Sequence, residues 1–302
     1  MKIGIAGTGK MGAAIAARLA ALGHEVRVWN RTLEKARALA AAGATVTTTP
    51  AALAASSEAV LSILTDAEAI RAVYHGPQGL LCGEVSGKLF IEMSTVRPEV
   101  QVALASAVRA KGAAPVECPV GGTVGPAREG KLIGFAGGEE ADVARARPIL
   151  EQLCRRVEHV GPVGAGARMK LAINLPLMVY WQALGEALAL CAPLGLDPAR
   201  LMDIFADTSG GTNALRVRGG VIAGVLRGER PAAVTFDVDS ARKDLRSMIE
   251  EARALGAELP VASRALECYD AAAREGLGPE DTAMVVARWA RRARHSVAGK
   301  GS

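Results

Sequence analysis

Short apolar runs alternate with amphipathic segments along the first half of the chain. "KIGIAG" at 2–7 and "EVRVWN" at 25–30 have the character of buried strands, and the segment after each has helical periodicity and ends at a glycine. "EAVLSIL", "KLFIEMS" and "APVECPV" continue the series. The intervening helices are expected near 66–74, 98–111 and 139–153. Strands that alternate with helices in this way predict a doubly wound parallel sheet.

The second half of the chain contains no convincing strand. A cluster of glycines and one proline interrupts the alternation near residue 162, and the segments that follow are helical in character. We therefore predict an α/β domain over residues 1–162 and an all-α domain over residues 163–302, joined by a long helix. The helices of the second domain are expected at about 166–194, 198–206, 239–256, 260–275 and 279–294.

Length and composition allow two domains and argue against a nucleic-acid-binding protein. The 302 residues are half hydrophobic, which is enough for a large core. The 36 basic and 31 acidic residues leave a net charge of +5 that is spread along the chain, and aromatic residues make up only 3%. Only "RWARRARH" at 288–295 is locally basic, and we interpret it as a solvated helix end. We expect no nucleic-acid partner.

The cysteines and the apolar segments indicate the compartment. Five cysteines are scattered without CxxC or Cys/His ligand spacing, so we expect reduced thiols and no metal site. The N-terminus has no signal-peptide pattern, and the uncharged run at 171–185 is shorter than a membrane span. We expect a cytoplasmic protein without a membrane partner.

A glycine-rich loop, "GTGKMG", follows the first strand and opens the first helix. In this position the backbone can approach a pyrophosphate at the N-terminus of the helix. The alternative is a tight turn that binds no ligand. The context favours a dinucleotide site in a Rossmann-type domain, formed by Gly7, Thr8, Gly9, Lys10, Met11 and Gly12.

The residues after the second strand favour NADP(H) over NAD(H). A cofactor without a 2′-phosphate usually meets an acidic residue there, whereas this chain has Asn30, Arg31 and Thr32. A guanidinium can bind a 2′-phosphate with two hydrogen bonds, each contributing about 1.5–3 kcal/mol. The alternative is that Arg31 is an ordinary exposed arginine.

A lysine precedes the least polar stretch of the chain. Lys170 and Asn174 are four residues apart, so they share one face of a helix. A lysine whose pKa is lowered by burial could exchange a proton with an alcohol. The alternative is that Lys170 extends to solvent and Asn174 binds a backbone carbonyl. Pro176 lies inside the same predicted helix, and we expect a bend or widened turn between Ala172 and Pro176.

Six motifs in order give the chain a resemblance to a known family. "GTGKMG", "WNRT", "EMSTV", "ECPVGGTVGPAREGKL", "GAGARMKLAIN" and "ARKDL" resemble the β-hydroxyacid dehydrogenases, in particular the 3-hydroxyisobutyrate dehydrogenases and the glyoxylate/succinic semialdehyde reductases. The resemblance covers nearly the whole chain. It implies an NADP(H)-dependent oxidoreductase that acts on a short 3-hydroxy acid or its semialdehyde, and a homodimer or homotetramer.

The resemblance also implies roles for single residues. Lys170 matches the catalytic lysine of the family, and Asn174 matches the asparagine that helps hold the substrate. Thr95 matches a residue beside both nicotinamide and substrate. Lys243, on the cofactor side, and Asp244 would close the site from the second domain, and Phe236 would line the pocket.

Two departures from the family pattern affect the substrate. Relatives commonly have Ser-Gly-Gly for the substrate carboxylate where this chain has Gly121, Gly122 and Thr123, and Pro126 replaces a usual glycine. Gly121, Gly122 and Thr123 remain expected substrate contacts, although Thr123 could instead cap the next turn. Two alternative functions stay open: an imine reductase-like enzyme, which would usually lack the lysine, and a non-catalytic NADP-binding protein.

Overall fold

The computed structural model of the chain describes the backbone of residues 1–298 and the side chains of residues 1–290. The chain forms two compact units, Met1–Leu171 and the residues from Ala172 onward. Helix α8 (Ala165–Leu190) begins in the first unit and continues in the second. The basic segment "RWARRARH" extends beyond residue 290, so its interpretation as a solvated helix end lies outside the described side chains. The domain boundary between residues 162 and 163 stays a prediction.

The first unit, all of whose residues are described, contains one nine-stranded sheet with the order β3-β2-β1-β4-β5-β6-β8-β7, and β9 pairs with β8. The first six strands in this order are parallel, which is the strand order of a Rossmann domain. The strands are β1 (Lys2–Ala6), β2 (Glu25–Trp29), β3 (Thr45–Val46), β4 (Ala59–Ser62), β5 (Leu89–Glu92), β6 (Ala114–Glu117), β7 (Val120–Gly121), β8 (Leu132–Gly137) and β9 (Cys154–Gly161).

The predicted fold class is confirmed, with one addition at the edge of the sheet. Strand β8 runs antiparallel to β6 and to β7. Only residues 122–131 connect β7 to β8, which is shorter than the dozen or more residues that a parallel crossover needs. The chain therefore returns antiparallel at this edge.

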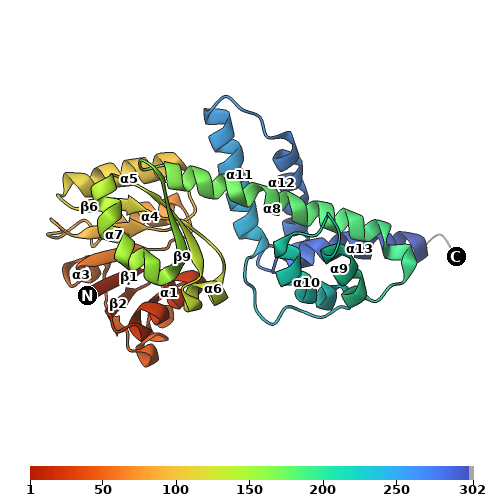
Figure 1. Cartoon of the computed structure of the whole chain (residues 1–302), viewed down its shortest axis with the longest axis horizontal. Helices are drawn as coiled ribbons and strands as arrows, with labels where there is room; N and C mark the ends of the chain where they lie inside the picture. Colours follow the sequence, from red (N-terminus) through yellow and green to blue (C-terminus); the bar gives the residue numbers. More distant parts are fainter. Residues whose placement is uncertain (299–302) are drawn as a thin grey trace. The chain divides into compact units, whose positions relative to one another are not determined.

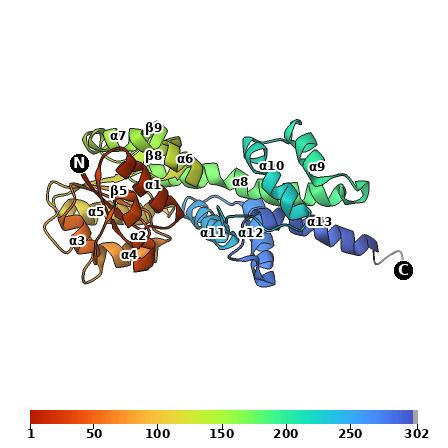
Figure 2. The ribbon, with the colours of Figure 1, turned by 90° about the horizontal axis from the view of Figure 1, so that it is seen from below.

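Helices cover both faces of the sheet (Figures 1 and 2). Within β5, Leu89 and Ile91 pack into one core and Phe90 packs into the other, because alternate side chains of a strand point to opposite faces. The first core includes α1 (Lys10–Ala21), α6 (Val124–Glu129) and α7 (Glu140–Leu153). The second includes α3 (Pro50–Ala55), α4 (Ala67–His75) and α5 (Pro98–Ala110).

Most helices of the first unit lie where the sequence predicts them. Helices α4, α5 and α7 match the expected ranges to within one residue at each end. Helix α2 (Leu33–Arg37) is shorter than expected, because the alanine-rich segment after it continues as a 3₁₀ turn that ends at Gly43. The short helices α3 and α6 lack the length that a periodic pattern needs to be recognised, and we did not expect them.

The described part of the second unit is helical. Helix α10, "NALRVRGGVIAGVL", escaped prediction because its three glycines and its valines are poor helix formers. Its N-terminus is capped by Thr212, which accepts a hydrogen bond from Leu215 N (3.1 Å). Tertiary packing stabilises the rest, since one core joins α8, α9, α10 and α13. After α8 come α9 (Pro198–Ala206), α10 (Asn213–Leu226), α11 (Val238–Ala254), α12 (Pro260–Ala272) and α13 (Ala283–Ala298).

The second half of α8 is held by α12 and α13. A Cβ atom at Gly185 would lie 2.5 Å from Trp289 Cδ1, so only glycine allows this close approach. Trp289 Nε1 donates to Gln182 Oε1 (3.0 Å), and Tyr269 Oη donates to the carbonyl of Met178 (3.1 Å). These contacts fix the part of α8 that follows the candidate substrate residue Asn174.

Helix α8 is continuous from Ala165 to Leu190 and contains Pro176. The expected bend near Pro176 stays a prediction. The uncharged stretch of this helix is only partly buried, because Ile173 and Pro176 are exposed. Only one stripe of the helix is buried, which includes Leu171, Met178 and Trp181. Among the described residues, no helix is both long enough and apolar enough to cross a membrane.

Candidate functional site

The glycine loop joins the C-terminal end of β1 to the start of α1. Gly7 has a positive φ of 95°, and a Cβ atom there would lie 2.2 Å from the carbonyl oxygen of Ile63, just past β4. A Cβ atom at Gly12 would lie 1.9 Å from the carbonyl oxygen of Gly7. These two glycines let the loop turn sharply and let α1 pack closely on it.

Gly9 and Thr8 have a different environment, which fits a bound pyrophosphate. A Cβ atom at Gly9 would meet nothing within 4 Å, so this glycine faces open space. Gly9 is also the N-cap of α1 and provides no side-chain cap for the first amides of the helix. Thr8 is buried, and its Oγ1 has no hydrogen-bond partner among the described residues. Free amides at a helix N-terminus, an open approach and an unpartnered hydroxyl match the needs of a phosphate group.

Lys10 and Met11 complete the first turn of α1. Lys10 is exposed, and the half-buried Met11 packs against the core on its face of the sheet. Thus Lys10 is free to contact a ligand, whereas Met11 supports the loop from within.

Asn30 connects the loop to the next strand. Its Oδ1 accepts a hydrogen bond from Thr8 N (3.0 Å), and its Nδ2 donates to the carbonyl of Thr32 (3.0 Å). Arg31 and Thr32 are exposed beside it, and Thr32 precedes α2 without capping it. The structure therefore brings the predicted loop and the predicted selectivity residues together, with Asn30 in a bridging role.

Three neighbouring strands of the same sheet each end in a polar residue, and these three residues form a row. Ser62 of β4 is the register partner of Glu92 of β5, and Glu92 is the register partner of Glu117 of β6. Partners in parallel strands project to the same face of a sheet. Ser62, Glu92 and Glu117 are each no more than 3% exposed.

Glu92 organises the loops that follow β4 and β5. Ser62 Oγ donates to Glu92 Oε2 and lies 2.6 Å from Tyr74 Oη, while Ser94 N donates to Glu92 Oε1 (2.7 Å). Ser94 Oγ in turn accepts from Leu64 N (2.7 Å). Thr95, half-buried, follows directly. The candidate residue Thr95 therefore lies on a loop that a buried carboxylate holds in place.

Burial changes the proton affinity of both acids. Burial raises the pKa of Glu92 to about 7, although hydrogen bonds from Ser62 and Ser94 act in the opposite direction. Burial also raises the pKa of Glu117 to about 7, against the effect of three backbone amides, and the charge of Glu92 raises it further. Neither glutamate is among the site residues predicted from the sequence. The available signal was an acidic residue at the end of two apolar strands, "LFIE" and "APVE".

The segment expected to bind the substrate, residues 121–123, lies at the edge of the sheet formed by β7. Gly121 ends β7, and Gly122 has a positive φ of 126°, which disfavours any residue with a side chain. Thr123 is exposed at the N-cap position of α6, yet its side chain makes no capping hydrogen bond. The alternative role of Thr123 as a side-chain cap is therefore not seen. Helix α6 packs on α1, so this segment lies beside the helix that the glycine loop opens.

Lys170 lies in the second turn of α8 and is 8% exposed. The start of this helix is bound by Glu117, which accepts from Gly164 N (2.6 Å), Gly166 N (2.8 Å) and Ala167 N (3.3 Å). Asn174 is half-buried one turn further along the same helix, in the second unit. The candidate pair thus lies on one helix face, with one member in each unit.

Phe236 lies in the second unit, in a segment fixed by Asp281. Asp281 is fully buried, accepts from Thr235 N (2.9 Å) and forms an ion pair with Arg218. The carbonyl of Phe236 accepts from Thr282 N (3.0 Å). These bonds hold the half-buried Phe236 just ahead of α11.

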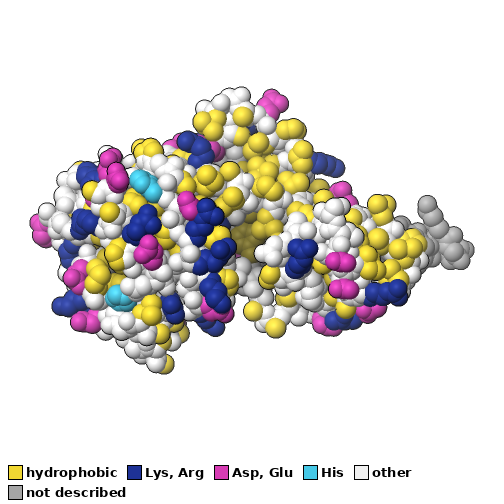
Figure 3. Space-filling view, viewed as in Figure 1, with side chains coloured by type: hydrophobic (Ala, Val, Ile, Leu, Met, Phe, Trp, Pro, Cys, Tyr) yellow, Lys and Arg dark blue, Asp and Glu magenta, His cyan; other side chains and the backbone are white. Residues whose placement is uncertain are grey.

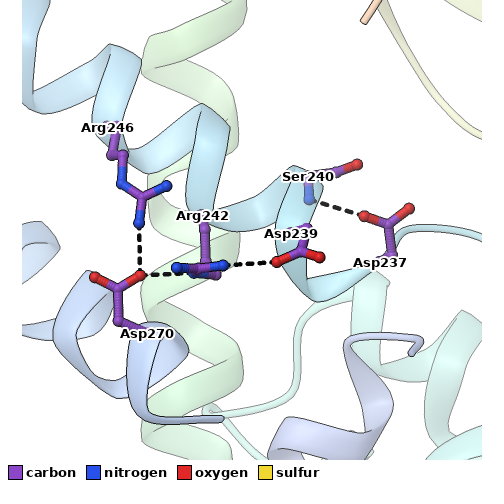
Figure 4. A network of polar contacts seen from close by, with 6 residues as sticks. All are labelled: Asp237, Asp239, Ser240, Arg242, Arg246 and Asp270. Atoms are coloured by element: carbon purple, nitrogen blue, oxygen red, sulfur yellow. Dashed lines mark hydrogen bonds and ion pairs between the residues drawn. The ribbon is translucent and has the colours of Figure 1, made fainter. Parts of the chain in front are cut away.

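Lys243 and Asp244 lie on α11. Lys243 Nζ forms an ion pair with Asp244 Oδ1 (2.7 Å), and the Asp244 side chain is only 4% exposed. Figure 4 shows a second group of charges that joins α11 to α12: Arg242 Nε and Arg246 Nη2 contact Asp270 at 2.6 and 2.7 Å. Arg242 also pairs with Asp239, and Asp237 caps the helix by accepting from Ser240 N (2.8 Å). The network holds the helix that carries Lys243 and Asp244.

The predicted residues therefore form two groups. The glycine loop, the residues after β2, Thr95, residues 121–123 and Lys170 belong to the first unit, whereas Asn174, Phe236, Lys243 and Asp244 belong to the second. All five cysteines lie in the described part of the chain and are free thiols.

Comparisons with known proteins match each part of the chain to a family of dehydrogenases. The family described as the NAD binding domain of 6-phosphogluconate dehydrogenase matches residues 2–161. The family described as the NAD-binding domain of NADP-dependent 3-hydroxyisobutyrate dehydrogenase matches residues 164–289. The chain belongs to the β-hydroxyacid dehydrogenase family. This confirms the resemblance, and the first unit is an NAD(P)-binding domain.

Individual members of this family resemble the chain over most of its length. Glyoxylate/succinic semialdehyde reductase 1 of Arabidopsis thaliana is 33% identical over 95% of this chain and 97% of its own. A 3-hydroxyisobutyrate dehydrogenase of Pseudomonas aeruginosa is 34% identical over 88% of this chain and 90% of its own. The solved structure of Psf3 in complex with NADP⁺ and 2-OPP has a TM-score of 0.83 and 30% identity, covering 94% of this chain and 98% of that one. Both relatives are named as a reductase or a dehydrogenase, which supports an oxidoreductase.

Proposed function

We propose that this protein is an NADP(H)-dependent oxidoreductase that interconverts a short 3-hydroxy acid and its semialdehyde, with Lys170 as the general acid and base. The observation that carries the proposal is a buried lysine, 8% exposed, in the second turn of the helix that begins beside the NAD(P)-binding sheet. Glyoxylate and succinic semialdehyde, which are also short aldehydes with a carboxylate, are alternative proposed substrates, since a relative is named after both.

Lys170 provides the proton in this proposal. When bound, the nicotinamide supplies or accepts the hydride at the carbonyl carbon. As reduction proceeds, negative charge develops on the carbonyl oxygen, and the ammonium of Lys170 donates its proton there. In the oxidative direction the neutral amine accepts the proton of the alcohol. Such a group typically contributes about 10²- to 10⁴-fold in rate.

The substrate carboxylate needs donors on this chain. Gly121 and Gly122 offer backbone amides, and the Thr123 hydroxyl makes no capping hydrogen bond that would compete for it. Asn174 adds an amide side chain one helical turn from Lys170. Several Lys and Arg side chains also gather over the α6 and β9 region of the first unit (Figure 3), where Arg128, Lys131, Arg155 and Arg156 are exposed. Lys131 and Arg156 pair with Glu129 and Glu158, whereas no ion pair is seen for Arg128 and Arg155 among the described residues. A positive surface attracts anionic substrates and cofactors.

Selectivity for NADP(H) is assigned to Arg31. The three residues directly after β2 include no acidic residue, and Asn30 uses its side chain to bridge the loop. The exposed guanidinium of Arg31 and the hydroxyl of Thr32 are the groups available for a 2′-phosphate. Lys243 would add a second cationic contact to the cofactor from α11.

The direct test is NADPH oxidation with methylmalonate semialdehyde, succinic semialdehyde and glyoxylate, compared side by side and repeated with NADH. We expect turnover of at least one of them with a higher kcat/KM for NADPH. No turnover of any semialdehyde, with NADPH still bound, would instead favour a non-catalytic NADP-binding protein. Reduction of cyclic imines without reduction of aldehydes would favour the imine reductase-like alternative.

A further inference from the structure

Glu117 makes an unusual connection between the sheet and α8. It is the last residue of β6, and its two carboxylate oxygens accept hydrogen bonds from Gly164, Gly166 and Ala167. These amides belong to the first turn of α8 and the residue before it. A carboxylate at the N-terminus of a helix satisfies amides that have no partner within the helix and complements the helix dipole. Glu117 thus ties this helix end to one strand of the NAD(P)-binding sheet.

The surroundings of Glu117 are shaped to admit a carboxylate. A Cβ atom at Gly137 of β8 would lie 2.4 Å from Glu117 Oε1. A Cβ atom at Gly166 would lie 2.3 Å from the carbonyl oxygen of Phe135 and 3.2 Å from Glu117 Oε1. Glycine at both positions leaves room for the carboxylate between strand and helix, so the contact is specific in shape as well as in charge.

Lys170 follows the anchored turn closely. It lies four residues after Gly166, hence about one helical turn along the axis. Each residue of an α-helix advances about 1.5 Å and rotates about 100°. A change in how the first turn is held would therefore shift and rotate Lys170 with it.

We propose that Glu117 is a positioning residue, which sets the place of Lys170 by holding the first turn of α8 in its anionic form. The inference rests on the proposed role of Lys170 as the general acid and base. Glu117 itself need not contact substrate or cofactor.

The groups around Glu117 determine how its anchoring depends on pH. Glu92 of the neighbouring strand is the register partner of Glu117. Tyr74 of α4 is linked to Glu92 through Ser62, and Cys118 follows Glu117 in the chain. A small cavity of about 10 Å³ is lined by Glu92, Glu117 and Gln101 of α5, and the side chain of Gln101 does not titrate. Burial raises the pKa of Glu117 to about 7, and the charge of Glu92 adds to this.

The sign of the expected effect follows. The anion accepts three amide hydrogen bonds, whereas the protonated acid binds them more weakly. As pH falls through about 7, the anchoring form is lost, so wild-type kcat should fall on the acidic side. Removing the charge of Glu92 lowers the pKa of Glu117, and the acidic fall in kcat should then move to lower pH.

The experiment measures kcat, KM and NADPH affinity from pH 5.5 to 8.5 in four proteins: wild type, Glu117→Gln, Glu92→Gln and Asp142→Asn. A displacement of about 1 Å at a reacting group can cost about 10²-fold, so we expect Glu117→Gln to lower kcat about ten- to a hundredfold. Its NADPH affinity should stay within about twofold, and its acidic fall in kcat should disappear. Hydrogen exchange of the Gly164, Gly166 and Ala167 amides should become faster in this variant.

Asp142→Asn is the matched control. Asp142 is also a buried carboxylate of the first unit, and it pairs with Arg109 rather than with α8. This variant should keep both kcat and its pH profile. If it lost kcat as strongly as Glu117→Gln, general destabilisation would be the cause and the proposal would be wrong.

Two further outcomes separate the proposals. If Lys170→Ala is inactive while Glu117→Gln keeps the wild-type kcat and pH profile, only the positioning role fails. If Lys170→Ala keeps its kcat, the proposed function itself fails. Should Glu117→Gln not fold, the shift of the acidic fall in Glu92→Gln decides, and a profile identical to wild type would refute the positioning role.

Discussion

The buried carboxylate of Glu92 should make the stability of this protein depend on pH in a direction opposite to that of most acidic residues. It is 3% exposed, and burial raises its pKa from 4.5 to about 7. A raised pKa means that the folded protein prefers the protonated acid. The contribution of Glu92 is therefore fully present below about pH 4.5 and is lost as pH rises through about 7.

Replacing Glu92 by Gln removes this pH dependence and keeps the shape of the side chain. The glutamine Oε1 can still accept from Ser94 N, and its Nε2 can bond to Ser62 Oγ. The rise in the pKa of Glu92 from 4.5 to about 7 corresponds to about 3 kcal/mol in all, because a difference of one in pKa is worth about 1.36 kcal/mol. Integrated between pH 5 and pH 8, the linkage gives a change of about 2.5 kcal/mol in the stability of the variant relative to wild type.

Urea unfolding followed by circular dichroism at pH 5, 6, 7 and 8 tests this expectation. The free energy of unfolding of Glu92→Gln, minus that of wild type, should rise steadily with pH. Glu129→Gln provides the control, because Lys131 lowers the pKa of the exposed Glu129 and the trend should then have the opposite sign and be small. A difference between Glu92→Gln and wild type that stays constant from pH 5 to pH 8 would show that Glu92 is not held protonated by burial.

Four other expectations concern the candidate site. Lys170→Ala should lower kcat by about 10²- to 10⁴-fold with little change in NADPH affinity, and a variant retaining over a tenth of kcat would remove lysine from the mechanism. Arg31→Asp should weaken NADPH binding at least about tenfold and reduce the difference in affinity between NADPH and NADH, measured by isothermal titration of both cofactors. Equal affinities of the wild-type protein for NADPH and NADH would contradict this expectation. Thr123→Val should raise KM for an acidic substrate about tenfold with a smaller effect on kcat, whereas an unchanged KM would mean that the carboxylate is bound elsewhere. Gly12→Ala should lower the thermal stability, because its Cβ would meet the carbonyl oxygen of Gly7 at 1.9 Å, while Gly9→Ala should fold normally and bind NADPH less well; equal thermal stabilities would refute the distinction.

Local patterns in the sequence predict much of this fold. Most strands and helices of the first unit follow from hydrophobic periodicity, because a strand buried on both faces and an amphipathic helix each leave a distinct pattern. The glycine loop could be recognised because its three glycines lie between a strand and a helix. Helix α10 could not, since its glycines and valines oppose helix formation and only its packing in the core of the second unit stabilises it.

The two buried acids, Glu92 and Glu117, show which features of the site cannot be predicted from the sequence alone. The sequence placed Glu92 and Glu117 within two apolar strands and Lys170 just ahead of a long uncharged stretch. Only the tertiary structure decided that β5 pairs with β6 in the register that makes these acids neighbours, and that Glu117 binds the start of α8, 47 residues away. Strand pairing and burial join segments far apart in the chain, and they also set the proton affinity of a carboxylate. A local sequence pattern predicts neither the strand pairing nor the burial, and the same residues in water would have ordinary pKa values.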